Sequence, residues 1–388
     1  MFDWIIIGGG IQGCTLAVSL IKAGKVSTDK LLIIDPHNEP LAQWKRNTKR
    51  LEMKYLRSPF VHHLDLDPFS LQRFARKSNI SQAFYGFYKR PSLNLFHAHC
   101  ETLFQESGLR SSWHQGTVAH LERKADEWLV KTDATSTFIT KNVAIATGFT
   151  DSLHYPEWSK EIRKNPPDLI RHIFEEEVQE IPHEYEPIVI VGAGITAAHL
   201  SIKLSNLHKK VILITRHPLR VKDFDSDPGW LGPNRMNSFL KIKDYKRRRE
   251  AITEARYRGS FPKELSLELS RLLKKNKLSI IHGEIKTCFN CGESLVQLIT
   301  DSEQKIETSP VIIATGFEGN MKHLSWLQEL TRREKLQCAD CGFPIVSKNL
   351  EWKKNLYVIG ALAELEVGPT ARNISGARTA ASRIVRSI

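Results

Sequence analysis

Apolar residues gather early in the chain into a short block that ends in glycines. Trp4–Ile7 form this block, and Gly8–Gly13 follow it with three glycines in a row and a fourth at the end. Beyond the turn, apolar residues recur at a helical spacing up to Ala23, and a second apolar block covers Leu31–Ile34. The pattern predicts a strand, a tight glycine turn, a helix and a second strand.

The same pattern returns in the second half of the chain. Ile188–Val191 run into Gly192–Ala197, a helical spacing of apolar residues follows, and Val211–Ile214 form the next apolar block. The two copies also close alike, because Val143–Phe149 and Val311–Phe317 are both apolar runs that end in Ala-Thr-Gly-Phe. A repeat of this length predicts an α/β fold with two Rossmann-like dinucleotide-binding domains.

The glycine turns have the chemistry of a pyrophosphate site. Gly8 allows a tight turn, Gly10 lets the pyrophosphate approach the backbone, and Gly13 lets the helix approach the strand. The pyrophosphate then lies at the N-terminus of the helix, where free N–H groups and a partial positive charge favour an anion. The second turn and the two strand ends supply the further candidates Gly192, Gly194, Ala197, Thr147, Gly148, Thr315 and Gly316.

The residue that ends each second strand distinguishes the two nucleotides. Asp35 can accept hydrogen bonds from ribose hydroxyls and would repel a 2′-phosphate, so the first site suits FAD. Thr215 and Arg216 stand at the corresponding place in the second copy and offer a hydroxyl and a cation to a 2′-phosphate. The second site therefore suits NADPH, with the alternative that Arg216 is only a surface residue after a strand.

The end of the chain returns to the first of these sites. An apolar strand ends at Gly360, and Thr370 is expected to cap a helix over residues 371–386. The N-terminus of such a helix, aimed at the flavin, would stabilise the negative charge that appears on reduction. Gly360 and Thr370 are therefore further candidates for binding FAD.

The first domain is discontinuous, because this C-terminal segment follows the second copy of the repeat. The sequence predicts an FAD-binding domain made of residues 1–165 and 330–388. The NADPH-binding domain, residues 166–329, is then inserted into it. A chain of 388 residues with 41% hydrophobic residues is long and apolar enough for two cores.

Charge and hydropathy exclude other classes of function. The net charge of +13 raises the question of nucleic acid, but the densest basic run, Lys241–Arg249, lies on an expected helix without a nucleic-acid-binding motif around it. A solvated helix face, or a contribution to an anionic cofactor or substrate, explains the run instead. The apolar runs are too short to cross a membrane, and six cysteines are too few for a secreted disulfide framework. We expect a cytoplasmic protein that binds neither nucleic acid nor a membrane, and a homo-oligomer stays open.

Two segments outside the repeat carry clustered polar side chains. Met53–Pro59 runs on to His62–Asp65 in the first domain, and Asp223–Pro228 lies in the second. Together with the glycine motifs, these segments resemble the flavoproteins with two dinucleotide-binding domains, and among them the lysine and ornithine N-hydroxylase group of flavin monooxygenases. The resemblance implies a reaction site that is lined by Arg57, Ser58, His62, His63, Asp225 and Asp227.

The same resemblance implies an oxidoreductase in which NADPH reduces FAD. Oxygen would add at flavin carbon 4a, and the resulting peroxide would transfer one oxygen atom to a small soft nucleophile, an amine or a sulfide. Two other classes stay open. One is a flavin reductase or oxidase that shares the reduction by NADPH but transfers no oxygen, and the other is a nucleotide-binding sensor without turnover.

The chain departs from this group and from the wider flavoprotein superfamily in three places. Gly229–Pro233 stands where the amino-acid hydroxylases have Ser-Pro-Phe-Val-Asn-Glu, so an amino-acid substrate stays open. Ala361 follows Gly360 where many relatives have an aspartate for the flavin ribityl chain, and Glu364 or a backbone group would have to replace it. Pro166 and Asp168 stand in place of the phenylalanine and glycine of the linker fingerprint of flavin-containing and Baeyer-Villiger monooxygenases.

Two Cys-x-x-Cys-Gly pairs suggest a metal site. Cys288, Cys291, Cys338 and Cys341 form the ligand set of a zinc ribbon, in which four thiolates surround one Zn²⁺. The long stretch between the two pairs leaves two alternatives, free or locally packed cysteines and a redox dithiol.

Overall fold

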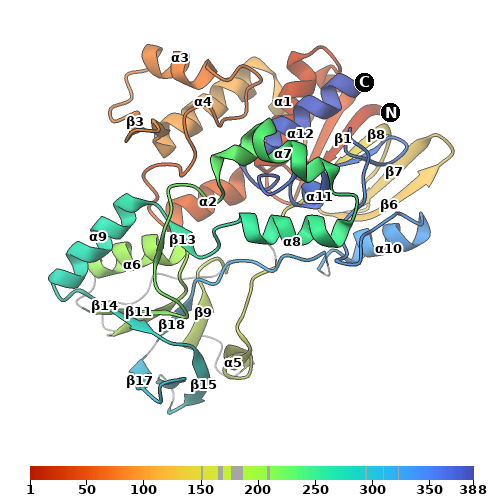
Figure 1. Ribbon diagram of the computed structural model, residues 1–388. Coiled ribbons are helices and arrows are strands. Elements are labelled where there is room, and N and C mark those ends of the chain that lie inside the picture. The colour runs from red at the N-terminus through yellow and green to blue at the C-terminus, as the bar shows by residue number, and fades with distance from the viewer. Residues whose placement is uncertain are drawn as a thin grey trace.

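The computed structural model contains two large sheets whose central strands are parallel, the first in the upper part and the second in the lower part of Figure 1, with helices packed against them. The structure describes residues 1–149, 152–164, 169–175, 187–207, 210–292, 295–308, 310–321 and 323–388. The predicted fold class, α/β with two Rossmann-like domains, is confirmed.

The first sheet has the strand order β19-β20-β8-β1-β2-β5, and an antiparallel hairpin of β6 and β7 continues it from β8. β1 lies between β2 and β8 and pairs in parallel with both. Because a central parallel strand is covered on both faces, its apolar run Trp4–Ile7 is buried throughout. The strands are β1 (Phe2–Ile7), β2 (Leu31–Asp35), β5 (Trp113–Gln115), β6 (Val118–Lys124), β7 (Glu127–Thr132), β8 (Thr137–Ile145), β19 (Glu351–Lys353) and β20 (Leu356–Val358).

The second sheet repeats this order with the strands β14-β11-β10-β18-β9. β10 lies between β11 and β18 and pairs in parallel with both, as β1 does with its neighbours. An antiparallel sheet of β15, β16 and β17 precedes β18, just as β6 and β7 precede β8. The strands are β9 (Ile170–His172), β10 (Ile188–Val191), β11 (Val211–Thr215), β14 (Leu278–His282), β15 (Ile285–Asn290), β16 (Val296–Thr300), β17 (Lys305–Thr308) and β18 (Val311–Ile313), and short pairs are formed by β3 (Phe84–Tyr85) with β4 (Arg90–Pro91) and β12 (Arg220–Val221) with β13 (Ser260–Phe261).

A helix follows each glycine turn, as the apolar spacing predicts: α1 after the first and α6 after the second. α1 packs against the C-terminal helix α12, which brings the two ends of the chain together beside the first sheet (Figure 1). The helices are α1 (Ile11–Lys22), α2 (Ala42–Arg50), α3 (Ser70–Lys77), α4 (Leu93–Glu106), α5 (Glu157–Lys160), α6 (Ile195–Leu207), α7 (Pro233–Lys241), α8 (Tyr245–Ala255), α9 (Lys263–Lys274), α10 (Ser325–Arg333), α11 (Glu364–Val367) and α12 (Ile374–Ser387).

The return from the second domain to the first comes earlier than the expected boundary at residue 329. That boundary falls inside α10, whose buried side chains Leu327 and Leu330 belong to the core of the first domain. Arg333 of the same helix donates a hydrogen bond to the carbonyl oxygen of Leu121 in β6. α10 therefore packs as part of the first domain, while the other expected boundary, at residues 165 and 166, lies outside the described residues.

Part of the inserted segment also covers the first domain. Phe239 of α7 and Ile252 of α8 are almost fully buried in the core of the first domain, and Figure 1 shows α8 running beside α11. The basic run Lys241–Arg249 is consequently divided between the end of α7 and the first part of α8, rather than lying on one helix face. Arg248 turns inward and donates hydrogen bonds to the carbonyl oxygens of Ile242 at 2.7 Å and Leu365 at 2.8 Å.

The C-terminal helix begins later than expected. Residues 368–373 form consecutive turns, in which Ala371 N–H donates to the Gly368 carbonyl and Asn373 N–H to the Thr370 carbonyl. α12 then starts at Ile374 with Asn373 at the N-cap position, so the prediction that Thr370 caps this helix is wrong. The chain turns tightly here because Gly376 has no side chain: a Cβ atom on it would lie 2.1 Å from the Thr370 carbonyl oxygen.

We expect Arg248→Met to lower the free energy of unfolding by about 3–5 kcal/mol. The change leaves the Leu365 carbonyl without its donor and removes the 2.9 Å ion pair of buried Glu366. Urea unfolding followed by tryptophan fluorescence measures the effect. Arg247→Met is the matched control, because Arg247 is exposed and its loss should change stability by less than about 0.5 kcal/mol. Equal effects of the two substitutions would contradict the role of Arg248.

Candidate active site

A cavity of about 1870 Å³ lies between the two domains. It is lined by both glycine turns and by both Ala-Thr-Gly strand ends, which come from the carboxyl ends of β8 and β18. In open α/β sheets, ligands bind at this end of the strands. A pocket for one drug-sized ligand has roughly 300–1,000 Å³, so this cavity has room for more than one nucleotide.

The first glycine turn has the geometry that a pyrophosphate needs. Gly8 has a φ of +108°, and a Cβ atom on Gly13 would lie 1.9 Å from the Gly8 carbonyl oxygen, so α1 starts in direct contact with the turn. A Cβ atom on Gly10, by contrast, would have nothing within 4 Å, because Gly10 faces the cavity. Gly13 therefore shapes the turn from behind, and Gly10 leaves the space open in front.

Asp35 lines the cavity at the end of β2. One carboxylate oxygen accepts the Gly9 backbone N–H at 2.7 Å, and the other accepts the His37 backbone N–H at 2.9 Å. The oxygen bound to His37 N–H also lies 2.8 Å from His37 Nδ1, whereas the oxygen bound to Gly9 N–H retains a lone pair that can accept a ribose hydroxyl. The carboxylate thus fixes the glycine turn and presents an acceptor to the cavity at the same time.

The second glycine turn repeats the first with small changes. A Cβ atom on Gly192 would lie 2.5 Å from the Ala314 carbonyl oxygen, while one on Gly194 would find its nearest neighbour, the Gly259 Cα, at 3.9 Å. Ala197 is fully buried and occupies the place of Gly13 behind the turn. Gly192 and Gly194 line the cavity, and Ala197 does not.

The two candidate residues at the end of β11, Thr215 and Arg216, have different environments. Arg216 lines the cavity, but Thr215 is buried, and its hydroxyl donates to the His217 carbonyl oxygen at 2.8 Å. Thr215 therefore orders the loop and does not face a ligand. Three further cations, which no sequence motif marks, line the cavity as well: Arg220, Arg258 and Lys286.

The two neighbouring histidines have different environments. His62 lines the cavity, and burial together with nearby Arg378 lowers its pKa to about 4, so its imidazole is neutral near pH 7. His63 is fully buried away from the lining; its Nδ1 accepts the Asp65 backbone N–H at 3.2 Å, and its Nε2 lies 3.1 Å from the Pro68 carbonyl oxygen. His63 thus holds the loop that carries His62, while Ser58 lines the cavity nearby.

Arg57 lines the cavity and joins the two domains. Its guanidinium donates to the backbone carbonyl oxygens of Lys222 at 2.8 Å, Phe224 at 2.6 Å and Asp223 at 3.2 Å. It also donates to the Ser260 hydroxyl at 2.9 Å. Burial lowers the pKa of Arg57, but the carbonyl oxygens around it compensate the charge. The residue therefore fixes the loop that leads to Asp225.

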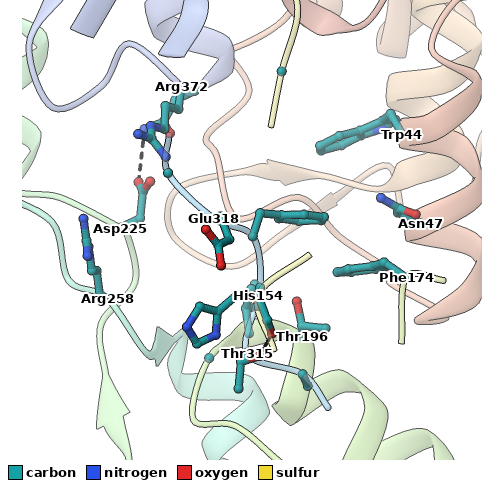
Figure 2. A pocket seen from close by; sticks show the side chains of 18 of the residues that line it. Trp44, Asn47, His154, Phe174, Thr196, Asp225, Arg258, Thr315, Glu318 and Arg372 are labelled. Carbon is teal, nitrogen blue, oxygen red and sulfur yellow. Dashed lines mark hydrogen bonds between the residues drawn. The ribbon is translucent and has the colours of Figure 1, made fainter. Parts of the chain in front are cut away.

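The two aspartates occupy different parts of the cavity wall. Asp225 accepts a hydrogen bond from the Asn373 side chain at 3.2 Å and lies on one side of the view in Figure 2 with Arg258. Asp227 accepts the Gly229 N–H at 2.8 Å as the N-cap of a short 3₁₀ helix and pairs with Arg235 at 3.1 Å. Asp225 consequently faces the C-terminal segment, and Asp227 orders the following turn.

The C-terminal segment reaches the cavity through backbone contacts. Gly360 has a φ of +68°, and a Cβ atom on it would lie 2.9 Å from the Gln12 side chain. Gln12 in turn donates to the carbonyl oxygens of Ala371 at 3.2 Å and Asn373 at 3.3 Å. Gly360 does not line the cavity, but Thr370 does. Glu364, the alternative for the flavin ribityl chain, is buried and holds Arg372 through two hydrogen bonds.

Several residues that line the cavity are not marked by any motif in the sequence. Figure 2 shows Trp44 and Asn47 from α2, with Phe174 near them and Glu318 and His154 in the middle of the view. These residues come from elements whose pattern is that of any amphipathic helix or strand end. Only the fold brings them to the carboxyl ends of the two sheets.

The four cysteines do not form a metal site. Among the residues that the structure describes, no group of three or more His, Cys, Asp or Glu side chains is placed to hold a metal ion, and all six cysteines are free. Cys288 packs on the core beneath the three-stranded sheet of the second domain, whereas Cys338 packs on the core of the first. The zinc hypothesis is therefore wrong, because each pair belongs to a different core.

Comparison with known proteins bears on this arrangement. Residues 5–150 match a protein-family model described as FAD-NAD(P)-binding. The cadaverine monooxygenase DfoA of Erwinia amylovora, solved with FAD, is 15% identical with a TM-score of 0.77, over 100% of this chain and 94% of that one. The ornithine N-hydroxylase KtzI of Kutzneria sp. 744 is 16% identical with a TM-score of 0.78, over 100% and 98%. This chain has the fold of these flavoproteins.

The fold also extends to other chemistry. The bacillithiol disulfide reductase of Staphylococcus aureus is 15% identical with a TM-score of 0.64, over 100% of this chain and 97% of that one.

A search of curated protein sequences finds no match. No described helix is long and apolar enough to span a membrane.

We expect Gly10→Val to abolish FAD binding without unfolding the protein. The new side chain meets no protein atom and would instead fill the space in front of the turn. Flavin absorbance after gel filtration measures occupancy, and circular dichroism measures folding. Gly232→Val is the matched control, because Gly232 also has open space around it but does not line the cavity. A folded Gly10→Val protein with full FAD occupancy would refute the assignment of the turn.

Proposed function

We propose that this protein is an FAD- and NADPH-dependent monooxygenase that transfers one oxygen atom to a small amine or sulfide. One observation supports the proposal above all: two glycine turns of dinucleotide-binding geometry line a single cavity. The whole chain also shares its fold with N-hydroxylating monooxygenases, one of which acts on cadaverine and another on ornithine. The partners of the proposed reaction are a small-molecule substrate and oxygen.

The first domain fits FAD. The Gly8–Gly13 turn would hold the pyrophosphate and Asp35 the adenosine ribose, since Gly10 leaves open space and the carboxylate faces the cavity. Ile374 and Ser375 line the cavity at the start of α12, where the first backbone N–H groups of a helix have no partner within it. When bound, FAD accepts a hydride from NADPH and, once reduced, activates oxygen.

The second domain fits NADPH. The Gly192–Gly194 turn would hold the pyrophosphate, and Arg216 at the end of β11 would pair with the 2′-phosphate. Arg220 and Lys286 line the same cavity and add positive charge. Because Thr215 is buried, we assign the 2′-phosphate to cations alone.

Residues of this chain would also position the substrate and limit water. Arg57 fixes the loop before Asp225, so that the second domain stays closed over the site. His62 stays neutral and offers a hydrogen bond without a charge. Apolar and aromatic side chains in the lining restrict water, and they include Trp44, Met53, Phe174, Phe317 and Trp326.

The alternative of a thiol-disulfide reductase has less support. In the part of the chain that the structure describes, no cysteine lines the cavity. Burial raises the pKa of both Cys14 and Cys100, which keeps these thiols protonated and unreactive. The free state of the six cysteines suits a reducing compartment, and we therefore place the protein in the cytoplasm.

We expect the protein to prefer NADPH over NADH and Arg216→Ala to remove most of this preference. A charge-assisted hydrogen bond contributes about 1.5–3 kcal/mol, or roughly ten- to a hundredfold in affinity. The rate of anaerobic flavin reduction at varied nucleotide concentration measures the effect. Arg247→Ala, on the exposed side of α8, is the control. Equal use of the two nucleotides by the unaltered protein would contradict the assignment.

The reaction class is tested by where the electrons of NADPH go. With a substrate among a panel of amines and sulfides, we expect NADPH consumption to match the formation of an oxygenated product, measured by mass spectrometry with ¹⁸O₂. Hydrogen peroxide is measured in parallel. If all consumed oxygen appears as hydrogen peroxide with every compound, the protein is an oxidase and the proposal fails.

A further inference from the structure

The hairpin of β3 and β4 has aromatic residues at the centre of its turn. The Lys89 N–H donates to the Gly86 carbonyl oxygen at 3.0 Å, so Gly86–Lys89 form a β-turn. Its central positions, which are commonly taken by Gly, Pro, Asn, Asp or Ser, are occupied by Phe87 and Tyr88. Figure 1 shows β3 at the outer edge of the first domain, away from both large sheets. The turn therefore carries two aromatic rings at the periphery of the molecule.

The two rings of the turn have different environments. Tyr88 lines the cavity, and its ring lies edge to face with the Phe224 ring of the second domain, with centroids 4.7 Å apart. Phe87 contacts only the edge of Tyr88 among the described rings, and its side chain is 92% exposed. Packing within the described residues explains the position of Tyr88 but not that of Phe87.

Other apolar side chains are exposed on the same part of the first domain. Together with Phe87 they form a surface that we call the aromatic edge: Leu66, Phe69, Tyr85 and Phe87, with exposed fractions of 38%, 51%, 40% and 92%. The Phe60 ring connects its parts, because its centroid lies 6.4 Å from that of Phe69 and 6.3 Å from that of Phe84, the neighbour of Tyr85 in β3. A continuous apolar surface of this kind is typical of a contact with another protein or with a membrane.

The charge around the aromatic edge has one sign. Residues 68–100 contain five Lys and Arg residues and no Asp or Glu. Two of the five are paired with acids from outside this segment, Arg73 with Asp67 and Arg90 with Glu264. The other three are exposed and form no ion pair with a described residue: Arg76, Lys77 and Lys89. The aromatic edge therefore complements an anionic surface.

Nucleic acids and anionic lipids both combine negative charge with groups that contact aromatic rings. Single-stranded nucleic acid binds in a positively charged groove, where successive bases stack on the faces of aromatic rings. Phe87 instead stands at the tip of a turn, where it can enter the boundary between lipid headgroups and acyl chains while cations beside it stay at the headgroups. The position of Phe87 thus favours the lipid surface.

We infer that the aromatic edge attaches this protein to the surface of a membrane that contains anionic lipids. Phe87 enters the interface, and Lys89, Arg76 and Lys77 contact the headgroups. The inference differs from the expectation from the sequence that the protein binds no membrane, because apolar runs too short to cross a bilayer can still contact its surface. It goes beyond the proposed function, and it places the membrane next to the cavity, which Tyr88 of the same turn lines.

Cosedimentation of the FAD-loaded protein with lipid vesicles tests the inference. We expect binding to vesicles of phosphatidylglycerol and phosphatidylcholine in equal parts, and little binding to vesicles of phosphatidylcholine alone. Phe87→Ser should weaken the binding on the order of tenfold, because the ring no longer leaves water. Lys89→Gln should weaken it about fivefold at low salt, as expected for the loss of one cation near an anionic surface.

Phe289→Ser is the matched control, since Phe289 is a 51% exposed phenylalanine on β15 of the second domain. It should leave vesicle binding unchanged. Circular dichroism and the flavin content check that each variant is folded, and Phe87 does not line the cavity.

Three results would overturn the inference. The first is that the unaltered protein does not bind the anionic vesicles, and the second is that Phe87→Ser binds them as well as the unaltered protein or no better than Phe289→Ser. The third is that Phe87 serves another partner: sedimentation velocity would show that Phe87→Ser dissociates a dimer of this chain, or fluorescence anisotropy would show that it abolishes binding of a single-stranded oligonucleotide.

Discussion

The architecture of the cavity depends on how closely the backbone approaches itself at two glycine turns. At the first, Gly8 lies against the Ala146 carbonyl at the end of β8, and at the second, Gly192 lies against the Ala314 carbonyl at the end of β18. A side chain at either place would push the turn away from the neighbouring strand. Because both contacts occur at the carboxyl ends of the sheets, they aim two helix N-termini at one space. The positions of the two turns therefore set the distance between the two helix N-termini at which nucleotides would bind.

The sequence predicts these turns well, because a repeated pattern of strand, glycine turn and helix has few alternatives. The parallel pairing of β1 with β2 and of β10 with β11 follows from the same pattern. The path of α7 and α8 does not, since the apolar side chains Phe239 and Ile252 are compatible with packing on either domain. Which core a surface helix joins is decided by the shape of both domains together, and the local pattern contains no information about it.

The candidate residues show the same division. Asp35 and Arg216 lie where the strand ends predict, because a strand fixes the place of the residue that follows it. The direction of a side chain in a loop is not fixed in this way, and Thr215 and His63 turn inward to satisfy buried backbone groups. The cysteine pairs show a related limit. The spacing of cysteines along the chain predicts metal ligands only when both pairs pack on the same core. Here the chain separates Cys288 from Cys338 by placing them on two cores.

Arg57 holds the opposite domain only by main-chain carbonyl oxygens and the Ser260 hydroxyl. Every residue type carries the same carbonyl group, so this contact depends on the path of the loop backbone and not on the side chains that the loop carries. Lys222 and Asp223 are therefore free to be exchanged without loss of this contact, whereas the Phe224 ring also packs against Tyr88 of the first domain. A protein built in this way can remodel the wall of its cavity, and with it the range of molecules it accepts, while its hinge stays the same.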